Sequence, residues 1–203
     1  MALVTKKNLQ YYHKARDLIH DGDVLLYRAS WKLSNKLIAK IGKSPYCHAA
    51  MAGWWRGQQG QRERLFLLET VQFRGARTSA LSEQVKKYPG QWDVYRVDQG
   101  KSFYQAKAVR YMIDLVSTKY GWCALGRAAL LHLPFIRYML TPEKEDELGE
   151  FPFCSMAVSA ALRAGRFDPC TKLADTFTEP GDLAESLEYK FTLDWDPIIG
   201  DGK

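Results

Sequence analysis

FPFCSMAVSAALRAG, residues 151–165, is the most informative stretch of this chain. Its alanine and serine content predicts a buried helix, and Gly165 is placed to end it. Pro152 fixes the entry of the chain, so Cys154 is expected in the first turn. The positive end of a helix dipole stabilises a thiolate there. Cys154 is therefore either a reactive thiol or a buried core residue, as most cysteines in small-residue helices are.

A possible base for such a thiol lies in CHAAMAGW, residues 47–54, which alternates like a strand. His48 falls in this segment, and Ala50 and Ala52 are small enough to leave space for a substrate. A thiolate beside an imidazole is the working pair of a cysteine hydrolase. His48 is thus the candidate partner of Cys154, although taken alone it fits a structural role equally well.

An imidazole base also needs a polar group that holds its second nitrogen. Glu69 ends an apolar strand, residues 65–72, that is expected to pair with the His48 strand. A carboxylate there is costly unless it has a partner. Glu69 is the candidate orienting residue, and a water-exposed glutamate at a strand end is the alternative.

The composition is that of one globular domain, and no cofactor is predicted. The chain has 203 residues, 46% of them hydrophobic, and a net charge of +6. Such a moderate basic excess is more typical of a solvated surface than of a nucleic-acid-binding face, so no nucleic-acid partner is predicted. The four cysteines are scattered without a Cys-x-x-Cys pair, which predicts neither a disulfide framework nor a metal site.

Membrane and secretion signals are not apparent in the sequence. Residues 1–10 carry two lysines with no following apolar block, unlike a secretory signal. The longest apolar stretch, residues 128–136, is far shorter than a membrane span. We therefore expect no membrane span and a cytoplasmic location.

The expected order of elements is a sheet followed by helices, with one strand returning at the end, which is an α+β pattern. The expected strands are residues 24–28, 47–54, 65–72, 74–78, 91–97 and 189–194, and the expected helices are residues 6–20, 30–41, 103–117, 154–164 and 180–187. This predicts an N-terminal helix within residues 1–21, then one domain over residues 22–203 with a helical insertion at 122–150.

Five short motifs, in order, resemble the circularly permuted branch of the NlpC-type papain-fold cysteine hydrolases, and more closely its YiiX-like group. They are GDVLL (22–26), YCHAAM (46–51), LE (68–69), FCS (153–155) and PGDL (180–183). The resemblance implies a single papain-like domain, with an antiparallel sheet packed against helices. It also implies that Cys154 is the nucleophile, His48 the general base and Glu69 the orienting residue. Cys47 departs from the pattern, because a serine or another small polar residue is expected there.

The implied activity is cleavage of an amide, in a peptidoglycan-type peptide or a related small substrate, through an acyl-enzyme on Cys154. A lipid thioesterase or acyltransferase of the same fold, or a binding protein without activity, are the alternatives. Tyr120 and Trp54 are candidate substrate contacts, and packing is the other explanation for both.

Overall fold

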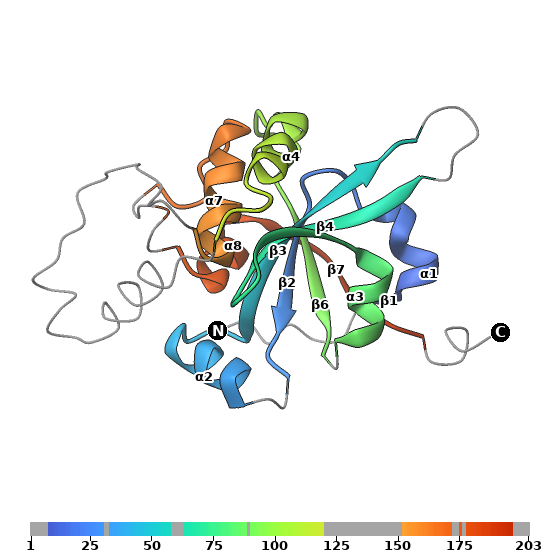
Figure 1. Ribbon diagram of the computed structural model, residues 1–203, viewed down its shortest axis with the longest axis vertical. Helices are drawn as coiled ribbons and strands as arrows, with labels where there is room; N and C mark the ends of the chain where they lie inside the picture. The colour runs from blue at the N-terminus through green and yellow to red at the C-terminus, as the bar shows by residue number, and fades with distance from the viewer. Residues whose placement is uncertain are drawn as a thin grey trace, which may run out of the picture.

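The computed structural model describes residues 8–30, 33–57, 63–88, 90–119, 152–171, 175 and 178–196. Within them the strands form one seven-stranded sheet in the order β1-β7-β6-β2-β3-β4-β5 (Figure 1). The strands are β1 (Leu9–Tyr11), β2 (Val24–Arg28), β3 (Tyr46–Trp55), β4 (Arg64–Val71), β5 (Gly75–Ala80), β6 (Trp92–Arg96) and β7 (Glu188–Asp194). All neighbours are antiparallel except β1 and β7, which are parallel.

Helices cover both faces of this sheet, which confirms the predicted α+β class (Figure 1). They are α1 (Tyr12–Ala15), the 3-10 turn η1 (Arg16–Leu18), α2 (Leu33–Ile41), α3 (Leu81–Lys87), α4 (Gln105–Asp114), α7 (Cys154–Ala164) and α8 (Pro180–Ser186). Side chains of α4, α7 and α8 join one core cluster, and those of α1 and α3 join the other. None of the described helices has the length and apolar character needed to cross a bilayer.

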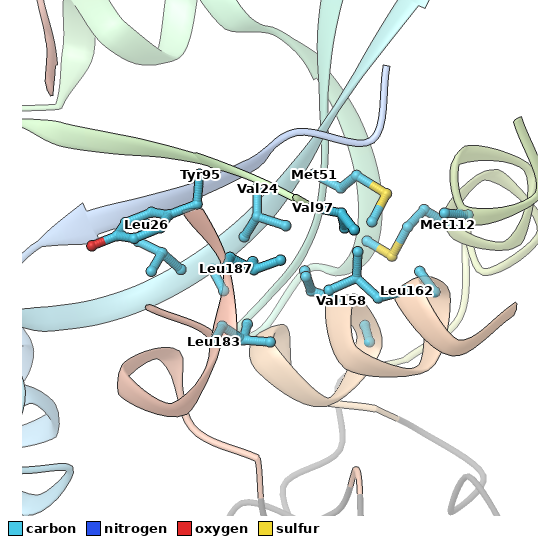
Figure 2. Close-up of a cluster of buried hydrophobic side chains, with 14 of the residues drawn as sticks. Val24, Leu26, Met51, Tyr95, Val97, Met112, Val158, Leu162, Leu183 and Leu187 are labelled. Carbon is cyan, nitrogen blue, oxygen red and sulfur yellow. The ribbon is translucent and has the colours of Figure 1, made fainter. Parts of the chain in front are cut away.

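The core under α7 holds this helix firmly against the sheet. Figure 2 shows Val24 and Met51 pointing from the strands toward Val158 and Leu162 of α7. All four side chains are fully removed from solvent. Burying a side chain of this size contributes about 1.5–3 kcal/mol, so α7 has a well-fixed position on the sheet.

The predicted helix over residues 6–20 is wrong in its first part. Leu9–Tyr11 forms β1 and pairs in parallel with β7, with Leu9 opposite Thr192. Within the described residues 8–20, only the four residues of α1 and the turn η1 are helical. Residues 9–18 therefore form a strand of the sheet followed by a short helix and a 3-10 turn, because pairing with a strand from the far end of the chain outweighs the local helical pattern.

Strands β3 and β4 pair along only half of β3. The register runs from Met51 opposite Leu68 to Trp55 opposite Arg64, and it does not extend to the beginning of β3. Residues before Met51 in β3 thus keep their pairing with β2 but have no ladder on the β4 side. We call this gap in the ladder between β3 and β4, before Met51 of β3, the opening in the sheet; His48 and Glu69 lie at it.

Candidate active site

Cys154 is the first residue of α7, as the sequence predicted. Its neighbour Phe153 is in extended conformation, and no side chain caps the helix start. The first N–H groups of a helix lack partners within the helix, so they create a positive potential at this end. Cys154 is 8% exposed. A thiol in this position is buried against the sheet, at the end of the helix that favours its anion.

His48 lies on β3 opposite Tyr27 of β2, next to a bulge. The register shifts there, since Arg28 pairs with Tyr46 and leaves Cys47 as the extra residue. The imidazole packs edge-on against the Tyr27 ring, with centroids 4.6 Å apart. The Cys47 thiol instead donates toward the Tyr27 carbonyl oxygen at 3.6 Å. A bulge of this kind redirects a side chain, so simple alternation along the strand does not describe this site.

Glu69 joins His48 directly and is almost completely buried, with 2% of the residue exposed. His48 Nε2 and Glu69 Oε2 are 3.0 Å apart. The Tyr27 hydroxyl donates to the same oxygen at 2.9 Å, and Arg77 donates to Oε1 from Nε at 3.0 Å and from an Nη at 2.6 Å. The alternative of a water-exposed glutamate is therefore excluded by its burial and its partners.

Cys154, His48 and Glu69 are brought together as one electrostatic unit. Burial raises the pKa of Cys154, but the charge and hydrogen bond of His48 outweigh burial and lower it below the ordinary value. Burial lowers the pKa of His48, whereas the Cys154 thiolate and Glu69 outweigh this and raise it. Because Glu69 holds Nε2, Nδ1 is the nitrogen left for the sulfur. This charge distribution favours a thiolate beside an imidazolium.

Backbone groups of Ala49 and Ser155 also favour the thiolate, since their hydrogen bonds lower the pKa of Cys154. The Ala52 N–H donates to the Asp23 carbonyl oxygen next to β2, so the Ala49 N–H, three residues earlier, points to the opposite edge of β3. That edge lacks a ladder with β4 before Met51. The opening in the sheet therefore leaves the Ala49 amide for the sulfur.

The structure describes Trp54, one of the two candidate substrate contacts. Trp54 is half-buried, and its indole N–H donates to the Ile19 carbonyl oxygen at 2.7 Å while the Arg16 guanidinium lies over its ring. It packs with the core cluster under α1 and α3. These contacts agree with the packing explanation for Trp54, and its role as a substrate contact stays a prediction. Tyr120 and the predicted insertion at 122–150 lie outside the described residues.

Sequence reasoning missed Tyr27 and Arg77, which hold Glu69. Each is recognisable only from strand register, since Tyr27 is opposite His48 and Arg77 is opposite Glu69. The β4–β5 hairpin offered a signal. An arginine and a glutamate at equal distances from a turn are expected to form a cross-strand pair.

Comparison with known proteins shows the fold of this chain but not its activity. No protein-family model matches the chain, and no curated protein matches it in sequence. A crystal structure of the metalloprotein YiiX from Escherichia coli O157:H7 is similar, with a TM-score of 0.52 and 14% sequence identity. The match covers 91% of this chain and 93% of that one. The chain thus has an α+β fold of the YiiX type, as its motifs predicted.

The residues at this site do not fit a metal ion. In the described parts of the chain, no group of three or more His, Cys, Asp or Glu side chains is arranged to hold one. Glu69 has both oxygens occupied by Arg77, Tyr27 and His48, and Arg77 places a positive charge beside it. A carboxylate so engaged has no free lone pair for a cation.

Proposed function

We propose that this protein is a cysteine hydrolase that cleaves amides, with Cys154 as nucleophile, His48 as general acid and base, and Glu69 as the residue that orients His48. The supporting observation is the contact of the Cys154 thiol with a histidine whose other nitrogen is bonded to a buried carboxylate. A low-pKa thiol beside an oriented imidazole is the requirement for nucleophilic catalysis by cysteine.

The first half of the reaction forms an acyl-enzyme. The Cys154 thiolate attacks the carbonyl carbon, and the carbonyl π electrons move to oxygen. The Ala49 N–H, which lies at the sulfur, is suited to stabilise that oxyanion together with the N–H groups at the start of α7. When the tetrahedral intermediate collapses, the C–N bond breaks and the Nδ1 proton of His48 goes to the leaving amine.

The second half releases the acyl group. Neutral His48 takes a proton from water at Nδ1, and the resulting hydroxide attacks the thioester carbonyl. The C–S bond breaks, the carboxylic acid leaves, and thiolate and imidazolium are regenerated. Glu69 stays ionised throughout, because its pKa is lowered to about 2; burial raises this pKa, but His48 and Arg77 outweigh burial.

The proposed substrate class is a small amide, such as a peptidoglycan-type peptide. Two probes test the reaction: a cell-wall stem peptide, and a short fluorogenic thioester for the thioesterase or acyltransferase alternative. Mass spectrometry of the quenched reaction should show the acyl group on the Cys154 peptide. Cys154→Ala should abolish turnover, with Cys170→Ala as the matched control. Turnover of the thioester alone would favour the alternative, and full turnover by Cys154→Ala would refute a cysteine mechanism.

A further inference from the structure

The buried carboxylate of Glu69 accepts all the hydrogen bonds it can. Two come from Arg77 to Oε1, one from Tyr27 and one from His48 to Oε2. An ionised carboxylate has about four lone-pair positions and no donor. Tyr27 and His48 must therefore both donate, and the proton of the neutral imidazole is confined to Nε2. Nδ1 then faces Cys154 as the acceptor.

Arg77 is the only cation among these three donors that is charged at every working pH. It lies directly opposite Glu69 in the β4–β5 register. Its side chain is 26% exposed, compared with 2% for Glu69. The guanidinium thus reaches in from the edge of the sheet and balances a charge that is cut off from water. A buried carboxylate that loses such a partner is costly to keep ionised.

We propose that Arg77 is a positioning residue: its paired hydrogen bonds to Oε1 keep Glu69 ionised, turn Oε2 toward His48, and thereby set the pH range in which Cys154 reacts. This inference rests on the proposed function and extends it by one residue. Arg77 acts through Glu69 and His48, and it touches neither the sulfur nor the substrate.

The pH dependence follows from the groups around Glu69. These are Tyr27 from β2, His48 from β3 and Arg77 from β5, with Cys154 of α7 beyond His48. Without Arg77, burial raises the pKa of Glu69. Glu69 then takes up a proton at a higher pH than in the wild type. The imidazolium of His48 loses its ionised carboxylate partner, and the Cys154 thiolate becomes less favourable. The acidic limb of Cys154 reactivity should therefore move to higher pH.

The test measures alkylation of Cys154 by iodoacetamide across about pH 4 to pH 9, read by peptide mass spectrometry. In Arg77→Gln the acidic limb should shift upward by about one pH unit or more. Arg77→Lys should fall between this variant and the wild type, because it keeps the charge but not the paired geometry. In a Glu69→Gln background, Arg77→Gln should add no further shift, since no carboxylate is left to titrate.

Arg110→Gln is the matched control, because Arg110 pairs with Asp114 on the exposed face of α4. The inference would be overturned if the acidic limb of the alkylation profile did not move in folded Arg77→Gln. It would also be overturned if Arg77→Gln moved this limb as far in the Glu69→Gln background as in the wild type. If Arg77→Gln does not fold, the shift in Arg77→Lys and the ¹⁵N spectrum of wild-type His48 test the inference instead. A proton on Nδ1 of the neutral His48 ring would overturn the inference. Alkylation of Cys154 needs no substrate. If the protein hydrolysed neither probe but Arg77→Gln still shifted the alkylation profile, the proposed function would be refuted and the inference about Arg77 would stand.

Discussion

Cys154 and His48 are in hydrogen-bonding contact, although one begins α7 and the other lies beside the bulge of β3. In His48→Ala, burial of the thiol remains but the compensating charge is lost. The pKa of Cys154 should return to its ordinary value or above, and alkylation near neutral pH should slow at least about tenfold. Cys170, whose pKa is raised by burial to about 11, is an internal control that should react slowly in both proteins. Unchanged Cys154 labelling would contradict the contact.

Hydrolysis should have a bell-shaped pH profile. The pKa of His48, lowered by burial but raised more strongly by Cys154 and Glu69, is about 10. The imidazolium that protonates the leaving group therefore persists in mildly alkaline solution and disappears as the pH passes through about 10. We expect kcat/KM on an amide substrate to fall there, while thiol alkylation does not. A decline already at neutral pH would contradict this assignment.

Glu69 should make the fold sensitive to acid. Its pKa is lowered from 4.5 to about 2, because His48 and Arg77 outweigh the effect of burial. A lowered carboxyl pKa stabilises the fold above the unfolded value, and this stabilisation is lost as the pH falls from about 4.5 to about 2. The loss is about 3 kcal/mol by linkage.

Urea unfolding at pH 7 and pH 3 tests this dependence. The difference between the two unfolding free energies should be smaller in Glu69→Gln than in the wild type. Glu83→Gln is the control, since Glu83 forms an exposed pair with Lys87 on α3. An equal acid loss in Glu69→Gln would mean that other carboxylates carry it.

Gly75, at the start of β5, should not tolerate a side chain. Its φ is +74°, and a Cβ there would lie 2.0 Å from the Thr118 carbonyl oxygen. That oxygen also accepts a hydrogen bond from the Ala76 N–H. Gly75→Ala should lower the free energy of unfolding by about 1–3 kcal/mol. Gly100→Ala is the control, because its Cβ would meet only Asp98 Oδ1 at 3.6 Å. Equal stability of the two variants would contradict this account.

Elements with a clear local pattern were predictable from the sequence. The α7 helix begins at Cys154 and ends at Ala164, as expected from its composition and Gly165. Strands β3 and β4 also lie where alternation and apolar runs placed them. These signals depend on neighbours within a few residues, so no long-range information was needed.

The remainder depended on contacts between distant segments. The strand β1 exists because it pairs with β7, and α3 is a short helix with only Leu81 and Val85 buried, which is too little for a visible period. The partners of Glu69 follow from strand register, and of the two only Arg77 had a signal in the sequence, from its place in the β4–β5 hairpin. The sequence suggested Cys154, His48 and Glu69 through their local motifs, whereas Tyr27 and Arg77 were missed because their contacts with Glu69 depend on strand pairing.

Because Cys154 and His48 are far apart in sequence, the pKa of the Cys154 thiol depends on folding. The lowered pKa of the sulfur depends on His48, and His48 reaches it only when α7 packs on β3. A growing chain on the ribosome, or a proteolytic fragment carrying α7 alone, therefore holds an ordinary thiol. The lowered pKa of this thiol is therefore a property of the folded chain.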